Sequence, residues 1–144
     1  MIILGIETSC DETAVAIIRG HSFAKASAGK LKNPPYPPLS RGAFEVLSNV
    51  VASQVKIHAP WGGVVPTLAK REHLKNLPIV LRRALREANL LSLNHRKTRK
   101  NPPHPPLLKG ADMIDLIAVT VGPGLEPALW TGINFAADLA KKWN

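Results

Sequence analysis

The sequence predicts an α/β domain in which a mixed sheet is built from elements in the order β-β-β-α-β-α. Three observations predict this class. Two Ile- and Val-rich runs flank a short polar segment near the start of the chain, apolar residues recur at helical spacing through its middle, and a nearly continuous apolar run leads into a glycine turn and a second helical pattern. Such a succession is typical of a sheet covered by helices.

The first three elements are expected to be strands. Residues 3–18 read ILGIETSCDETAVAII and predict a β-hairpin packed against a core. Residues 44–55, FEVLSNVVASQV, are rich in β-branched side chains and predict a third strand that extends the hairpin in antiparallel fashion.

A long amphipathic helix is expected to follow, from about Pro66 to Leu90. Gly62-Gly63 marks a turn before it, Pro66 suits a first helical turn, and the apolar residues after it recur at helical spacing. Pro78 is expected to kink this helix because proline removes one backbone donor.

The last two elements are a strand and a helix joined by a glycine turn. Residues 113–121, MIDLIAVTV, predict a central parallel strand buried on both faces. Gly122-Pro123-Gly124 follows, and then a helix is expected from Leu125 to Trp143. A strand, a glycine turn and a helix N-terminus together form a natural anion site, because free N–H groups and the positive helix end converge there.

The polar segment from Glu7 to Thr13 is the first candidate site. It alternates carboxylates with hydroxyls, and like charges this close repel one another unless a cation, a ligand or water lies between them. Asp11 and Glu12 are suited to an oxygen-ligated divalent metal, and Thr8 and Ser9 with their backbone N–H groups to a phosphate. The alternative is an ordinary solvated turn whose side chains bond their own backbone.

Composition limits the domain organisation. The 144 residues, 45% of them apolar, provide one modest core and predict a single domain or a piece of one. A single cysteine, Cys10, excludes an internal disulfide and fits a reducing compartment; its acidic neighbours favour a packing role over a reactive thiolate. No apolar run approaches the roughly 20 residues of a membrane span, and the first residues lack the basic segment of a secretory signal.

The net charge of +9 is concentrated in two segments, residues 20–43 and 92–111. They hold nine of the 19 basic residues and none of the 10 acidic ones, so the remainder is formally neutral. KNPPYPPLSRGA in the first and KNPPHPPLLKGA in the second agree at nine of twelve positions, which indicates one low-complexity element inserted twice. We interpret both as extended, proline-rich loop inserts that the fold tolerates; basic arms on RNA, or proline-rich ligands for an aromatic groove, are the alternatives.

Two histidines and three arginines invite further hypotheses. The spacing of His58 and His73 matches no common metal-ligand pattern, so a surface or helix-packing role is expected for both. Arg82, Arg83 and Arg86 are expected on the solvated side of the long helix, with an RNA-facing role as the rarer alternative.

Three runs in this order resemble the TsaD family of tRNA threonylcarbamoyl transferases: GIETSCDETAVAI, QVKIHAPWGGVVPTLAKREHL and TVGPGLEPALWTGINFA. The resemblance implies the first lobe of the actin-like ATPase (ASKHA, ribonuclease H-like) fold, in which two similar lobes close over a nucleotide. Residues 1–144 are then a single partial domain, the N-terminal lobe, carrying the two inserts.

The resemblance also implies a function. Such enzymes transfer threonylcarbamoyl from threonylcarbamoyl-adenylate to N6 of the adenosine next to the anticodon of tRNA, in the cytoplasm, with a homologous TsaB-like subunit and an ATPase partner. It places Asp11 and Glu12 as the acidic groups near the reacting end. Thr8, Ser9 and the turn Gly122, Pro123 and Gly124 would shape the phosphate side.

The chain also departs from the family pattern. The resemblance implies one divalent metal, iron or zinc, held by a His-x-x-x-His motif and an acid that lie beyond Asn144, so no metal ligand is assigned here. Ala137 stands where the family pattern has a basic residue. One wall of a cleft is not expected to catalyse transfer by itself. The alternatives are a non-catalytic lobe that pairs with a TsaB-like partner and, less favoured because no metal-ligand pair is suitably spaced, a metallopeptidase; a sugar kinase of the same superfold is more distant.

Overall fold

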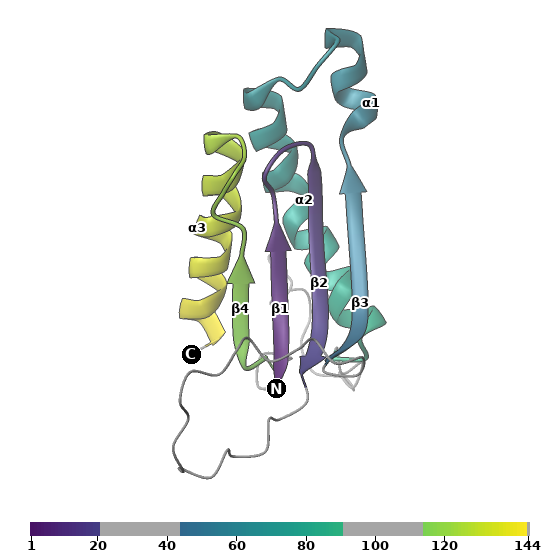
Figure 1. Ribbon diagram of the computed structural model, residues 1–144, viewed down its shortest axis with the longest axis vertical. Helices are drawn as coiled ribbons and strands as arrows, with labels where there is room; N and C mark the ends of the chain where they lie inside the picture. Colours follow the sequence, from purple (N-terminus) through teal and green to yellow (C-terminus); the bar gives the residue numbers. More distant parts are fainter. Residues whose placement is uncertain (21–43, 91–113, 144) are drawn as a thin grey trace, which may run out of the picture.

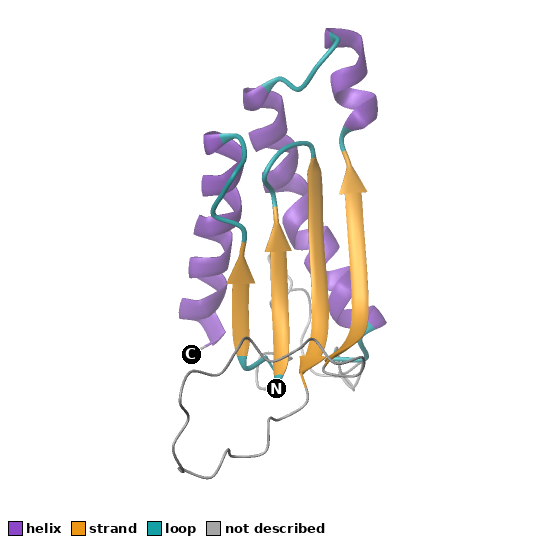
Figure 2. Cartoon of the chain, viewed as in Figure 1, coloured by secondary structure: helices purple, strands orange, loops and turns teal. Residues whose placement is uncertain are grey.

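The computed structural model describes residues 1–20, 44–90 and 114–143. Within them a four-stranded sheet forms one layer, and two long helices cover one of its faces (Figure 1; Figure 2). The α/β class with a mixed sheet is therefore confirmed. The elements are β1 (Ile2–Glu7), β2 (Glu12–Gly20), β3 (Phe44–Ser53), α1 (Val55–His58), the 3-10 helix η1 (Ala59–Trp61), α2 (Pro66–Glu87), β4 (Leu116–Val119) and α3 (Glu126–Trp143).

The sheet has the strand order β3-β2-β1-β4. β1 pairs antiparallel with β2, from Ile2 opposite Arg19 to Glu7 opposite Ala14. β2 pairs antiparallel with β3, which confirms the expected extension of the hairpin, and β1 pairs parallel with β4. Consequently β1 and β4 end at the same edge of the sheet, where the hairpin turn and the glycine turn both lie (Figure 1).

The core lies between the sheet and the two long helices. Alternate residues of the central strands point into it, as expected for a sheet covered on one face. Its fully buried large apolar members come from three elements: Leu4 of β1, Val15 and Ile17 of β2, and Leu77, Leu81 and Leu85 of α2. The small side chain of Ala136 and the side chain of Leu139 bring α3 into the same cluster.

The segment between β3 and α2 was not anticipated. A single turn of α-helix, α1, leads directly into η1, and Gly62 ends it in the left-handed conformation with φ of 68°. This conformation suits glycine, which lacks the Cβ that makes it unfavourable. Four and three residues are too few to show a helical period in the sequence.

The long helix begins at Pro66 as predicted and ends at Glu87, three residues before the predicted end. Asn89 has a φ of 57°, a left-handed conformation that commonly terminates helices. Helical structure is continuous across Pro78, whose side chain is exposed.

The prediction for the last strand is partly wrong. β4 is parallel to β1 as expected, but it includes only Leu116–Val119 and its residues alternate between exposed and half-buried. It is the outer strand of the described sheet and no helix covers its second face, so its apolar run does not reflect burial on both sides (Figure 2).

Most of the two proline-rich inserts, 20–43 and 92–111, lies outside the described residues; Gly20 is the last residue of β2. None of the helices in the described part of the chain is long and apolar enough to cross a membrane.

Candidate functional site

The hairpin turn between β1 and β2 is held by its own backbone carbonyls. Three successive carbonyl oxygens each accept a hydrogen bond from a different part of the lobe. Ser9 O accepts from the N–H of Leu125 at 2.7 Å, Cys10 O from Nε2 of His73 at 3.0 Å, and Asp11 O from the N–H of Gln54 at 2.9 Å. The turn is therefore tied to the glycine turn, to α2 and to the end of β3.

The two turns that the sequence predicts as ligand-binding are in direct contact. A Cβ built on Gly124 would lie 2.6 Å from the carbonyl oxygen of Ser9 and 2.8 Å from its Cβ, so only glycine fits here. Gly122 and Pro123 precede it on the exposed side of the same loop. The structure thus brings Ser9 and Gly122–Gly124 together.

Thr8 lies beneath this surface rather than on it. Its side chain is fully buried, and its hydroxyl donates to the carbonyl oxygen of Ala128 at 2.9 Å. The second turn of α3 approaches so closely that a Cβ on Gly132 would lie 2.3 Å from the Thr8 hydroxyl oxygen. In this structure the Thr8 side chain joins β1 to α3.

Asp11 is the last residue of the hairpin turn and is half-buried, and Glu12 is the exposed first residue of β2. Among residues 1–20, 44–90 and 114–143, no three or more His, Cys, Asp or Glu side chains are grouped so that they could hold a metal ion. The described residues alone therefore do not fit the divalent metal considered for this pair.

Cys10 behaves as its surroundings predict. Burial raises the pKa of its thiol, and the adjacent Asp11 acts in the same direction. The side chain is half-buried and free of any disulfide. A thiol with a raised pKa is a poor nucleophile, so the packing role is supported.

The start of α3 offers fewer free donors than the sequence argument assumes. The N–H of Leu125 is bonded to Ser9, those of Ala128 and Leu129 both reach the carbonyl of Leu125, and Pro127 has none. Anion binding at this turn would therefore depend on the exposed loop backbone of residues 122–124 more than on the helix end.

The structure connects Glu7, which lies in the predicted polar segment but was assigned no role, to Thr120, which the prediction omitted. Glu7 is the last residue of β1, and Thr120 directly follows the neighbouring parallel strand β4. The Thr120 hydroxyl donates to Oε2 of Glu7, and the Ser9 N–H donates to Oε1. Burial acts to raise the pKa of Glu7, but these hydrogen bonds outweigh it and hold the pKa below the ordinary value of 4.5. In the sequence, the signal for Glu7 and Thr120 was that each is a polar residue at the end of a predicted strand.

The Glu7 carboxylate lies at one end of an open groove of about 390 Å³ on the sheet face that the helices leave uncovered. Small side chains form the floor of this groove: Gly5, Ala14, Ala16 and Ala118. Asn49 and Thr120 add polar groups to its lining.

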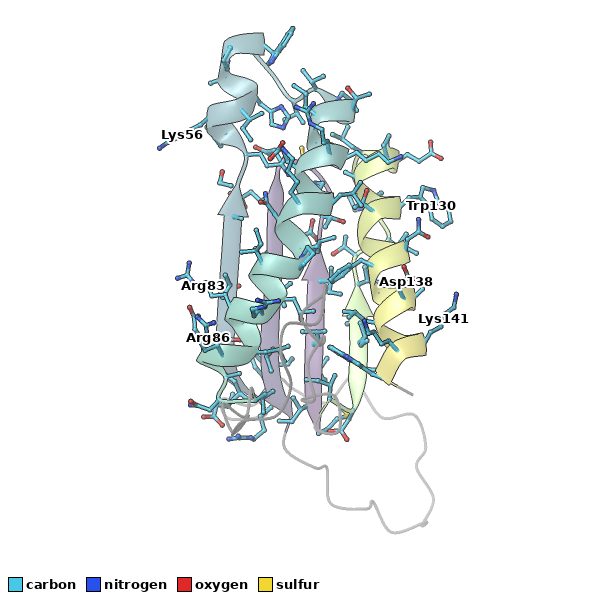
Figure 3. All side chains as sticks on the ribbon, turned by 180° about the vertical axis from the view of Figure 1, so that it is seen from behind. Lys56, Arg83, Arg86, Trp130, Asp138 and Lys141 are labelled. Carbon is cyan, nitrogen blue, oxygen red and sulfur yellow. The ribbon has the colours of Figure 1, made fainter. Side chains whose placement is uncertain are left out.

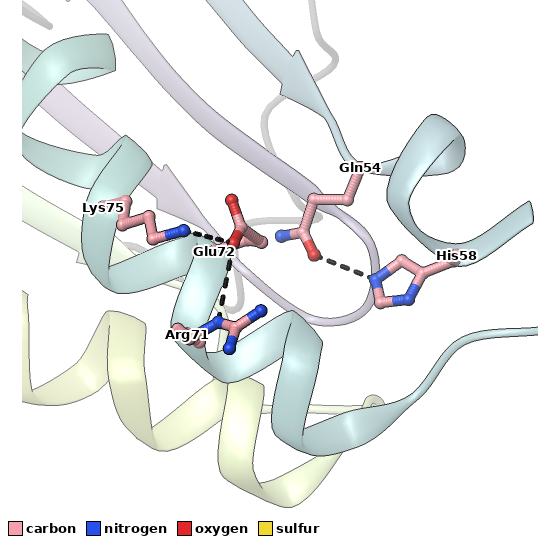
Figure 4. Close-up of polar contacts among 5 residues, drawn as sticks. All are labelled: Gln54, His58, Arg71, Glu72 and Lys75. Carbon is pink, nitrogen blue, oxygen red and sulfur yellow. Dashed lines mark hydrogen bonds and ion pairs between the residues drawn. The ribbon is translucent and has the colours of Figure 1, made fainter. Parts of the chain in front are cut away.

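Both histidines are buried, so the packing role expected for them is supported and the surface role is wrong. The Thr13 hydroxyl lies 2.8 Å from Nδ1 of His73, and Gln54 Nε2 lies 3.2 Å from the same nitrogen. His58 reaches the side-chain oxygen of Gln54 at 3.0 Å (Figure 4). Burial lowers the pKa of His73 below its ordinary value of 6.5.

Beside this network, the carboxylate of Glu72 is largely buried and paired with Lys75 at 2.6 Å, with Arg71 at 3.7 Å (Figure 4). Farther along α2, Arg82, Arg83 and Arg86 are exposed. Arg83 pairs with Glu87 at 2.8 Å, and Arg83 and Arg86 project outward from the helix (Figure 3). These contacts are those of a solvated helix face.

Comparison with known proteins gives one consistent result. The profile of the family TsaD, described as tRNA N6-adenosine threonylcarbamoyltransferase, matches residues 45–94. Relatives with that name are 44% identical over 140 residues in Thermosipho africanus, 42% over 144 in Thermosipho melanesiensis and 40% over 139 in Bacillus thuringiensis. These matches cover 97%, 100% and 96% of this chain but 30%, 31% and 29% of the relatives. Over nearly its whole length the chain is thus similar to proteins of the TsaD family, and it spans about 30% of the length of the relatives it matches.

Proposed function

We propose that this chain is the N-terminal part of a tRNA threonylcarbamoyladenosine modification enzyme. In a complete enzyme the reaction transfers threonylcarbamoyl from threonylcarbamoyl-adenylate to N6 of the adenosine next to the anticodon. The observation that carries the proposal is the contact between the two turns at Ser9 and Gly124, in a chain that is 40–44% identical to relatives named for this activity. We also propose that the protein is located in the cytoplasm.

The fold supports a nucleotide cleft at this edge. The strand order β3-β2-β1-β4, with two helices on one face, fits the first lobe of the actin-like ATPase fold, and we propose that assignment. In such a lobe the hairpin turn and the Gly122–Gly124 turn form one wall of the cleft. Ser9 and the exposed backbone of the glycine turn would face the phosphate of the adenylate.

The chemistry assigns different tasks to the acidic residues. An exocyclic amine is a weak nucleophile, so transfer needs a positioned carbonyl, stabilisation of the developing charge and an acceptor for the proton of the amine. Glu12 is exposed at the start of β2, where it is free to face a substrate, and Asp11 precedes it at the end of the hairpin turn. We assign them to the reacting end, whereas Glu7 is committed to Ser9 and Thr120.

The TsaD family implies one divalent metal. Residues 1–20, 44–90 and 114–143 supply no group of ligands for it, so we propose that its ligands, and the remaining contacts to the adenylate, come from other residues of the complete enzyme. Accordingly, the chain by itself is expected to show no transferase activity, because one wall of a cleft cannot provide transition-state binding.

The outer faces of α2 and α3 suit a protein partner. Leu74 and Trp130 are 57% and 53% exposed and line one cavity of about 430 Å³ between the two helices. Figure 3 shows Trp130 projecting outward from α3. Large exposed apolar side chains on adjacent helices are typical of interaction surfaces. We propose a TsaB-like homologous subunit as the occupant, with an ATPase as the further partner. Trp130→Asp should weaken binding to that subunit, whereas Trp61→Asp, in the exposed 3-10 helix, should not.

The test of the function is a chimera. The 140 matched residues of the Thermosipho africanus relative are replaced by this chain, and threonylcarbamoyladenosine is measured in unmodified tRNA after reaction with threonylcarbamoyl-adenylate and the partner proteins. The chimera should be active, and Glu12→Ala should reduce transfer by about 100-fold or more.

Glu87→Ala is the matched control, since Glu87 is an acid whose observed contact is a surface ion pair with Arg83. It should leave transfer unchanged. Full activity of Glu12→Ala would refute the role of Glu12. An inactive, folded chimera beside an active parent relative would contradict the proposed function.

A further inference from the structure

One side chain is among the donors that hold the hairpin turn, which ends at Asp11 directly before Glu12 of β2. Of the three donors that bind its successive carbonyls, those of Leu125 and Gln54 are backbone N–H groups. The third is the imidazole of His73, which reaches Cys10 O from α2, 63 residues farther along the chain. His73 is thus the only one of these donors that depends on residue type and protonation state.

The proton positions on His73 and His58 follow from the two backbone groups at the ends of the network, the carbonyl of Cys10 and the N–H of Val65. A carbonyl oxygen only accepts, so Nε2 of His73 must carry the proton shared with Cys10. A backbone N–H only donates, so Nδ1 of His58 must accept from Val65, at 3.3 Å, and its Nε2 must carry the proton. Gln54 lies between them; its oxygen accepts from His58 at 3.0 Å, and its amide nitrogen donates to Nδ1 of His73.

The Cys10 carbonyl and the Val65 N–H therefore require the same placement of protons on the two histidines. His58 and His73 are neutral with the proton on Nε2, and the hydroxyl of Thr13 donates to Nδ1 of His73. The side chains of Thr13, Gln54 and His73 are fully buried and that of His58 nearly so, so water does not substitute for a missing partner. A buried polar group without a partner is costly, which makes any other arrangement unfavourable.

We propose that His73 is a positioning residue for Asp11 and Glu12. It acts as a neutral donor that fixes the Cys10 carbonyl, and Gln54 and His58 fix its proton on Nε2. The placement of the turn follows from this geometry alone; its importance for transfer rests on the proposed function.

Removal of the His73 donor should loosen the turn while the sheet stays intact. The N–H of Gln54 reports on the carbonyl of Asp11, and the N–H of Leu125 reports on that of Ser9. In His73→Leu both amides should exchange with solvent about tenfold faster, relative to core amides such as that of Val15. His73→Gln retains a side-chain N–H and should recover most of the protection.

The experiment measures amide exchange by NMR on the full chain, together with the imidazole nitrogen resonances of His73 near neutral pH. Leu85→Ala is the matched control, because it removes a buried side chain of α2 that belongs to the apolar core rather than to the polar network. It should accelerate exchange evenly, without a preference for Gln54 and Leu125.

Three results would overturn the inference. The first is that Nδ1 of His73 carries the proton. The second is that the Gln54 and Leu125 amides exchange in His73→Leu as slowly as in the wild type. The third is that Leu85→Ala accelerates these two amides, relative to core amides, as much as His73→Leu does. If His73→Leu fails to fold, the wild-type nitrogen resonances and His73→Gln decide. None of these readouts requires transferase activity, so they remain valid if the proposed function is wrong.

Discussion

The contact between Thr8 and Gly132 allows a quantitative prediction. In Gly132→Ala the new methyl carbon would lie 2.3 Å from the Thr8 hydroxyl oxygen and 3.4 Å from its Cβ and Cγ2. The first distance is about 1 Å short of an ordinary contact. Thr8 is fully buried and its hydroxyl is bonded to Ala128, so the clash must be relieved by moving α3 or by breaking that hydrogen bond.

The expected loss of stability combines three effects. Overpacking of a buried site costs about 1–3 kcal/mol, and loss of a buried hydrogen bond about 1 kcal/mol more. Alanine in place of glycine within a helix offsets up to about 1 kcal/mol. Gly132→Ala should therefore lower the free energy of unfolding by about 2 kcal/mol, measured by urea denaturation followed by circular dichroism.

Two controls isolate the contact. Gly63→Ala has no atom within 4 Å of the new Cβ and should change stability by less than about 0.5 kcal/mol. Thr8→Ala removes the clashing oxygen, so Gly132→Ala should cost less in that background than in the wild type. A Gly132→Ala variant as stable as the wild type, or one with the same cost in both backgrounds, would refute the reasoning.

Three further predictions concern the turn, the network and the long helix. Gly124→Ala should destabilise the chain by about 1–3 kcal/mol, because its Cβ would overlap the backbone of Ser9; a smaller change by urea denaturation would contradict the contact. Burial lowers the pKa of His73 from 6.5, so below that pH the unfolded state binds more protons than the folded state. The contribution of His73 to the free energy of unfolding should therefore be complete above about pH 6.5 and decrease below it, by up to about 1.4 kcal/mol per pH unit. A pH series in which His73→Gln shows the same slope as the wild type would contradict this. Pro78→Ala, at an exposed position inside α2, should raise the thermal midpoint because proline is about 3 kcal/mol less favourable than alanine in a helix, and an unchanged or lower midpoint would show that the helix is adapted to proline.

Local patterns predicted most of the fold. The hairpin, the third strand, the start of α2 at Pro66 and the parallel pairing of β4 all follow from periodicity and turn residues, which act within a few positions. The burial of β4 did not follow, because an apolar run does not reveal how many of its faces are covered. The single turn α1 was missed because its four residues are too few for a helical period to repeat.

Only part of the candidate site was predicted, because local patterns do not reveal contacts between residues far apart in the sequence. The hairpin turn and the glycine turn were each visible as local motifs, and their contact at Ser9 and Gly124 follows from the pairing of β1 with β4. The position of Thr8 inside the lobe depends on Gly132, which is 124 residues away in sequence. The role of His73 likewise depends on a carbonyl in the hairpin turn, and no spacing rule connects the two.

The central claim is that the two turns at this sheet edge form one half of an adenylate site. The most direct test is an NMR titration of the full chain with adenosine monophosphate at millimolar concentration, following backbone amide shifts. If the two turns form this site, the largest shifts should occur at Ser9, Asp11, Gly122 and Gly124, and Gly124→Ala should diminish them. Shifts confined to the uncovered sheet groove or to the outer faces of α2 and α3, or no shifts at all, would contradict the adenylate site.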